Sequence, residues 1–143
     1  MPVPTPGMEL QPVARGQWRT FCESFGRAHR GWLVTLRRLS TRQLEFDREQ
    51  AVTEAEVMCS GVPLRRIVEV TSPGGRDGLL IAVAADGIEQ WLAIDDVVAL
   101  YDERTEGGDY GLRTDCSDGT TALLEFRVDA LPEAVDGLAA SEL

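Results

Sequence analysis

The chain has 143 residues, of which 43% are hydrophobic and 27% are charged, and it carries a formal net charge of −10 at pH 7. This length and composition are typical of one globular domain that buries its core without disulfides or metals. The negative charge disfavours nucleic acid and acidic membrane surfaces as partners, because both repel carboxylates.

The charge is unevenly placed along the chain. Residues 1–50 contain 8 arginine and 5 acidic residues, a net of +3, whereas residues 51–143 contain 6 arginine and 19 acidic residues, a net of −13. The two parts could pair within one fold or between two copies of the chain, and the alternative is a solvated acidic surface that aids solubility.

The start of the chain, Met1-Pro-Val-Pro-Thr-Pro-Gly7, lacks the basic and apolar regions of a secretion signal, and no apolar run approaches the length of a membrane span. The three cysteines, Cys22, Cys59 and Cys116, are an odd number at long spacing, which argues against a disulfide framework. We therefore expect a cytoplasmic protein that does not associate with membranes.

Residues 1–12 contain four prolines, so we expect a flexible tail there, followed by a single α+β domain over residues 13–140. An amphipathic helix begins the domain, and Gly31 occupies the position of a left-handed cap that ends it. Gly26 lies inside this helix and indicates close packing against a neighbour. The apolar stripe consists of Trp18, Phe21, Cys22, Phe25 and His29. We expect Trp18, Phe21, Phe25 and Trp32 to be largely buried against the sheet.

Strands dominate the rest of the chain. Trp32, Val34 and Leu36 alternate with their neighbours, which predicts a strand. Residues 40–56 are ambiguous, with a short edge strand as one interpretation. Asp86-Gly87 and Asp118-Gly119 are typical of hairpin turns. The later predicted strands are residues 66–71, 78–85, 88–94, 97–103, 110–116 and 120–128, and a short helix is expected over 131–140.

The expected fold is therefore α+β. An N-terminal amphipathic helix packs on a mainly antiparallel sheet of about six strands, and a short C-terminal helix ends the domain. The sheet is either open or curled into a small barrel. Fold analogy alone fixes no function.

Several segments together resemble a bacterial family of small proteins. They are residues 18–36, Val62-Pro-Leu-Arg-Arg-Ile67, Ser117-Asp-Gly-Thr-Thr-Ala-Leu-Leu-Glu-Phe-Arg127 and Leu131-Pro-Glu-Ala-Val-Asp-Gly137. The chain is similar to the family called domain of unknown function 5335 over most of residues 18–137, with extra residues within 40–61. The resemblance implies a bacterial origin and a small size. No activity is established for that family, so it implies no mechanism and no site residues.

His29 is the only histidine and the first candidate for acid–base chemistry. Cys22 lies two helical turns away, about 10 Å along the axis, which is too far for a thiol–imidazole hydrogen bond. A catalytic pair would require the fold to bring Cys59 or Cys116 to His29. The structural alternative is that His29 caps the C-terminal end of the helix, or bonds a backbone carbonyl near Gly31. We predict no catalytic residues.

The sequence predicts no metal site and no cofactor. The cysteine spacing does not suit zinc, and the carboxylates within 95–96, 102–103 and 115–118 follow no calcium-loop spacing. The glycine-rich segment 74–78 lacks the lysine and hydroxyl residue of a phosphate loop, and we interpret it as a hairpin turn.

Arginine and tryptophan side chains are the remaining candidates for binding. Arg38 and Arg66, each in an adjacent pair of arginines, could form an anion patch if their strands are neighbours. Since successive strand residues face opposite ways, only one residue of each pair would contribute. Trp91 could provide an aromatic platform, with core packing as the alternative. The candidate ligand or interaction residues are His29, Arg30, Arg38, Arg66 and Trp91.

These observations favour a non-enzymatic domain that binds another protein or a second copy of itself. Open sheet edges and the contrast between the arginine-rich front and the acidic remainder support this interpretation. The alternative is a small hydrolase or ligand-binding protein with a pocket that uses His29 and nearby Asp and Arg residues. Single-stranded nucleic-acid binding on a barrel face is disfavoured by the net charge.

Overall fold

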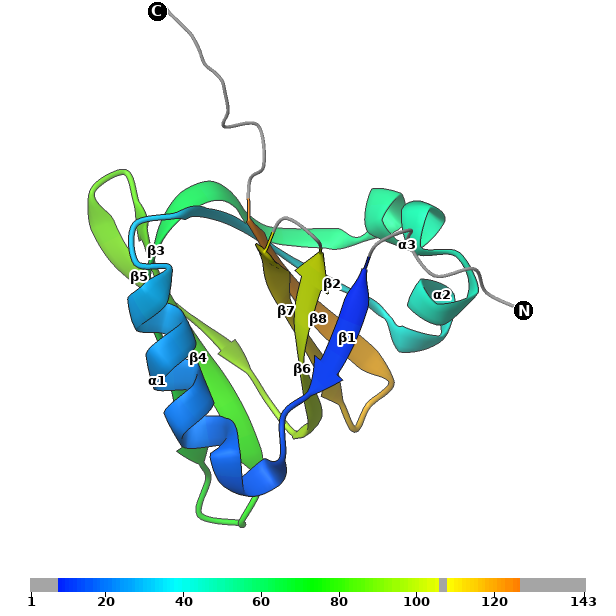
Figure 1. The fold of residues 1–143 in the computed structure, drawn as a ribbon, viewed down its shortest axis with the longest axis horizontal. Helices are drawn as coiled ribbons and strands as arrows, with labels where there is room; N and C mark the ends of the chain where they lie inside the picture. Colours follow the sequence, from blue (N-terminus) through cyan, green and yellow to red (C-terminus); the bar gives the residue numbers. More distant parts are fainter. Residues whose placement is uncertain (1–7, 106–107, 127–143) are drawn as a thin grey trace, which may run out of the picture.

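The structure is a computed structural model that describes residues 8–105 and 108–126. It contains an eight-stranded antiparallel sheet and short helices (Figure 1), with the strand order β1-β6-β7-β8-β2-β3-β4-β5. The strands are β1 (Glu9–Pro12), β2 (Leu33–Ser40), β3 (Glu56–Thr71), β4 (Asp77–Ala85), β5 (Ile88–Ile94), β6 (Val97–Thr105), β7 (Gly108–Cys116) and β8 (Thr120–Phe126). The helices are α1 (Trp18–Ala28), which follows the 3₁₀ turn η1 (Arg15–Gln17), α2 (Thr41–Phe46) and α3 (Arg48–Glu54).

The predicted α+β fold class is wrong, because the described chain is mainly one antiparallel sheet with short helices. The sheet has eight strands rather than about six, and it is not closed into a barrel, since β1 and β5 form its two ends. Residues 9–12, which we expected in the flexible tail, form β1 and pair with β6. The expected helix over 131–140 lies outside the described residues.

Two short helices replace the edge strand considered for residues 40–56. The side chain of Ser40 accepts a hydrogen bond from the backbone N–H of Gln43 at 3.2 Å, and Asp47 accepts one from Gln50 at 3.2 Å. These caps satisfy first-turn amides that have no partner within the helix. The helices cover a second, small core formed by Leu39, Leu44, Ala51 and Leu123. With 11 residues, α1 is the longest helix in the described part of the chain, and none of the helices there could cross a bilayer.

The main core lies between α1 and the sheet. As predicted, Trp18 and Phe25 are buried; Cys22 is buried with them, and Phe21 packs at the edge of the core. Trp32 is 49% exposed, so the prediction that it is buried is wrong. Its ring packs edge-on against His29 and Phe126 at the end of the core, with ring centroids 4.7 and 5.0 Å away. The sheet residues facing α1 in this core include Leu36, Leu64, Ile67, Leu79, Ile81 and Val83.

Both predicted hairpins are present. Asp86 and Gly87 have φ values of 53° and 78°, and Ala85 pairs with Ile88 across the turn. A two-residue turn with both residues in the left-handed region matches the twist of the strands. The second hairpin has the three-residue loop 117–119, in which the Gly119 N–H donates to the Cys116 carbonyl at 3.2 Å.

A buried ionic cluster connects α3 to the sheet. Arg48 donates to the two carboxylate oxygens of Glu103 at 3.0 Å each, and Glu103 is 0% exposed. Glu125 pairs with both Arg48 and Arg37. Burial acts to lower the pKa of Arg48, but the hydrogen bond and the charge of Glu103 raise it overall. This cluster therefore depends on charges that neutralise one another.

Candidate functional site

A positively charged groove lies between α1 and β3, hereafter the arginine groove. Its volume is about 400 Å³. Four arginines and one glutamate line it, which gives its walls a net charge of +3. The lining residues are Glu23, Gly26, Arg27, Arg30, Arg65, Arg66, Ile67 and Val68.

Close packing of α1 on β3 positions the groove. A Cβ added at Gly26 would lie 3.0 Å from the backbone nitrogen of Ile67, so the helix approaches the strand at a distance that only glycine permits without a shift. Arg27 is exposed in the last turn of α1, and Arg30 is exposed just after the C-cap residue of the helix. Their charge interacts favourably with the negative end of the helix dipole. The dipole does not explain the two arginines on β3.

An irregularity in β3 exposes Arg65 and Arg66 together. The pairing of β3 with β4 shifts register between Leu64 and Arg66. Both arginines are exposed, whereas Leu64 before them and Ile67 after them are buried. The expectation that only one residue of the pair would contribute is therefore wrong, because a bulge breaks the strict alternation of a regular strand.

The groove arginines differ from most other arginines in having no acidic partner in the described part of the chain. Within the described residues, no carboxylate forms an ion pair with Arg27, Arg30, Arg65 or Arg66. Seven other arginines are paired, namely Arg15 with Asp77, Arg19 with Glu69, Arg37 with Glu125, Arg48 with Glu103, Arg76 with Asp96, Arg104 with Asp102 and Arg113 with Asp115. The groove thus brings together four arginines that no described carboxylate neutralises by an ion pair.

Trp91 lies beside Arg66 on the sheet face that turns away from the main core. Arg66, Ala82 and Trp91 form one row across β3, β4 and β5, and they lie on the same face of the sheet. The guanidinium carbon of Arg66 lies 5.9 Å from the centroid of the Trp91 ring, a cation–π arrangement. Trp91 is 44% exposed, so the platform interpretation holds better than core packing for this tryptophan.

His29 does not contribute to the groove. It is buried at the C-terminal cap of α1, where Nδ1 donates to the Phe25 carbonyl at 2.8 Å. Its ring lies 4.4 Å from the ring of Phe25 and 4.5 Å from that of Phe126, measured between centroids. These contacts match the structural interpretation, in which His29 caps the helix.

Arg38 lies apart from the other candidates. It lines a hollow of about 230 Å³ with the turn carboxylates Asp95, Asp96 and Asp118. The structure therefore brings together three of the five candidates, Arg30, Arg66 and Trp91, and separates His29 and Arg38 from them. Sequence reasoning did not select Arg27 and Arg65. The available signal was weak: Arg27 is one helical turn before Arg30, and Arg65 is adjacent to Arg66.

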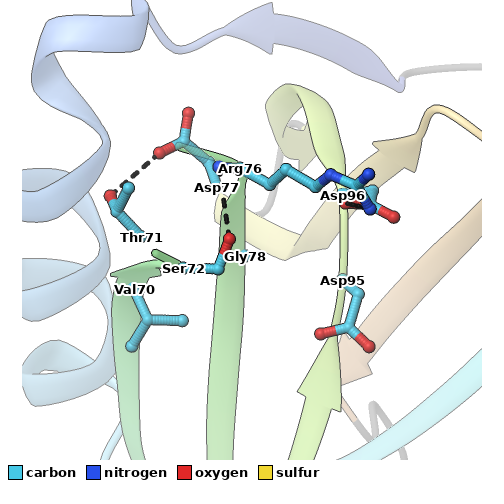
Figure 2. A pocket seen from close by; sticks show the side chains of 8 residues that line it. All are labelled: Val70, Thr71, Ser72, Arg76, Asp77, Gly78, Asp95 and Asp96. Atoms are coloured by element: carbon cyan, nitrogen blue, oxygen red, sulfur yellow. Dashed lines mark hydrogen bonds and ion pairs between the residues drawn. The ribbon is translucent and has the colours of Figure 1, made fainter. Parts of the chain in front are cut away.

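A hollow of about 330 Å³ beside the β3–β4 turn has a structural explanation (Figure 2). The side chain of Thr71 donates to Asp77 at 3.1 Å, and Asp77 also pairs with Arg15. Arg76 lies 3.4 Å from a carboxylate oxygen of Asp96. These contacts stabilise the turn. Within residues 8–105 and 108–126, no group of three or more His, Cys, Asp or Glu side chains is arranged to hold a metal.

The three thiols are poor nucleophiles near neutral pH. Burial, followed by the charges of Glu69 and Glu23, raises the pKa of Cys22 to about 12. Burial also raises the pKa of Cys59 and of Cys116. Each thiol therefore stays protonated at neutral pH, whereas the thiolate is the reactive form.

Comparisons of the chain with protein families, with curated proteins and with solved structures gave no match. The resemblance described from the sequence remains a prediction.

Proposed function

We propose that this chain is a non-enzymatic protein-interaction domain whose arginine groove binds an acidic segment of a protein partner. The observation that carries the proposal is a set of four exposed arginines, none ion-paired with a described carboxylate, that line one groove between α1 and β3. Guanidinium groups suit carboxylates, because their planar N–H donors match the two carboxylate oxygens.

Charge favours a protein segment over nucleic acid as the occupant. The chain has a net charge of −10, so phosphates of a long polymer would be repelled wherever they extend beyond the groove. A short acidic peptide segment is attracted by the local field and needs to contact little else. Trp91 beside Arg66 adds an aromatic surface that can pack against an apolar residue flanking the acidic ones.

Fluorescence anisotropy with a labelled oligoglutamate peptide tests this function. Two double variants, Arg27→Gln with Arg30→Gln and Arg65→Gln with Arg66→Gln, remove half of the cations each. Exposed ion pairs contribute about 0.2–1 kcal/mol, so each single arginine should account for an about 1.5- to 5-fold loss of affinity. Added salt should weaken binding as well, because the groove is open to solvent.

Arg42→Gln is the matched control. Arg42 is an exposed arginine on α2 without an ion pair to a described carboxylate, and α2 lies away from α1 (Figure 1). Its replacement removes one positive charge, half of the charge that each double variant removes, and should leave affinity nearly unchanged. Equal losses in the control and in the groove variants, or no peptide binding at all, would contradict the proposal.

A further inference from the structure

The outer edge of β5 pairs with no other strand among residues 8–105 and 108–126. β5 is the last strand of the sheet and pairs only with β4 in the described part of the chain. Ile88 and Trp91 are 66% and 44% exposed. Backbone N–H and C=O groups at such an edge form a template for a further strand.

The opposite edge of the sheet, formed by β1, has features that protect natural sheet edges against pairing with another strand. β1 has 4 residues, carries Glu9 and ends at Pro12, which has no N–H to donate. β5 has 7 residues, contains no proline, and pairs with β4 without any register shift. Glu89 is its only charged residue. One edge is therefore short and blocked, and the other is regular and available.

We propose that a second copy of this chain pairs with the β5 edge, antiparallel and about a two-fold axis at Trp91. Because Trp91 is the middle residue of Ile88–Ile94, this register pairs every residue of the strand. It places Trp91 opposite Trp91 and Glu89 opposite Ala93, so no like charges face each other. Gln90 lies opposite Leu92, and Ile88 lies opposite Ile94. The dimer interface and the surface beside the arginine groove share Trp91, which also contacts Arg66 of its own chain.

The sequence of β5 favours this register over its neighbours. A shift that centres the axis on Glu89 would place two carboxylates opposite each other, which destabilises a cross-strand pair. A shift by one residue would pair odd-numbered with even-numbered residues. It would place the sheet face that carries Trp91 in one copy beside the face that carries the core residue Ile94 in the other. In the Trp91 register the two indole rings are neighbours, and each is already contacted by its own Arg66.

The asymmetry of the two edges also limits the assembly to two copies. A two-fold axis uses the same edge of both chains, and the remaining free edges are both β1. Since β1 is short and ends in proline, further addition of chains is disfavoured. A closed dimer with one continuous sheet follows. Its stability comes from backbone hydrogen bonds and apolar contacts, so it should persist when salt is raised.

Sedimentation velocity over a range of protein concentrations, at low and high salt, tests the dimer. The wild-type chain should dimerise at both salt concentrations. Trp91→Glu places two carboxylates opposite each other and should raise the dimer dissociation constant roughly tenfold or more. Val98→Glu, at another exposed apolar residue on a different strand, is the matched control and should dimerise like the wild type.

Hydrogen exchange on the unmodified chain gives a second readout in case a variant fails to fold. Amides of β5 should become more protected as the protein concentration rises through the dissociation constant, whereas those of β1 should not. A monomer at every concentration, equal effects of Trp91→Glu and Val98→Glu, or concentration-independent protection of β5 would each overturn the proposal. Concentration-dependent protection confined to β5 would support it.

Discussion

Removal of Arg48 should cost this fold a large part of its stability. In the variant Arg48→Ala, the carboxylate of Glu103 remains fully buried and loses both hydrogen bonds of 3.0 Å from the guanidinium. Glu125 loses a contact of 3.5 Å to the same group. Removing one partner of a buried ion pair typically costs about 3–5 kcal/mol, since the other charge is left without compensation. We expect a loss in this range.

Urea denaturation at neutral pH, followed by tryptophan fluorescence, measures this loss. Arg42→Ala is the matched control, because it removes an exposed arginine on a neighbouring helix, and it should change the free energy of unfolding by less than about 0.5 kcal/mol. Replacing Arg48 by methionine together with Glu103 by leucine should recover much of the loss, since no buried charge remains. A loss below about 1 kcal/mol for Arg48→Ala would refute the reasoning.

Two further predictions concern a close backbone contact and a thiol. A Cβ at Gly111 would lie 2.0 Å from the Leu124 carbonyl oxygen, so Gly111→Ala should lower the free energy of unfolding in urea by about 3 kcal/mol. Gly74→Ala is the control and should cost little, because nothing lies within 4 Å of its added Cβ. Equal denaturation midpoints for the two variants would contradict this prediction. The native state keeps Cys22 protonated with a pKa of about 12, while the unfolded thiol releases its proton near its ordinary value of 9.0. The contribution of the Cys22 thiol to the free energy of unfolding is therefore fully present below pH 9.0 and is lost as the pH rises above it. The free energy of unfolding should fall by about 1.4 kcal/mol between about pH 8 and about pH 10. The variant Cys22→Ala should lack this part of the pH dependence. Parallel curves of unfolding free energy against pH for the wild type and the variant would contradict the prediction.

Local signals in the sequence predicted the hairpins and the first helix well. Asp86-Gly87 adopts the backbone that this residue pair favours, and the stripe of Trp18 and Phe25 is buried as helical spacing predicts. The helices α2 and α3 were missed although the sequence contains capping signals. Ser40 and Asp47 are each followed three residues later by glutamine, a pattern typical of helix starts.

The candidate site depended more on tertiary structure. Arg30, Arg66 and Trp91 were selected from residue type, and they do lie in one region. Arg65 was not selected, because its exposure beside Arg66 results from a bulge that the alternation of β3 conceals. The arginine groove itself arises where Gly26 lets α1 approach β3, and no local pattern specifies which strand meets that glycine.

An NMR titration with unlabelled oligoglutamate tests the proposed role of the arginine groove most directly. Backbone amide signals and arginine Nε–Hε signals of the ¹⁵N-labelled chain would be followed as peptide is added. Saturable shifts should concentrate at Arg27, Arg30, Arg65 and Arg66, with the Trp91 indole N–H shifting alongside them. Absence of saturable shifts, or shifts spread equally over arginines outside the groove, would contradict the assignment of the arginine groove as the binding site.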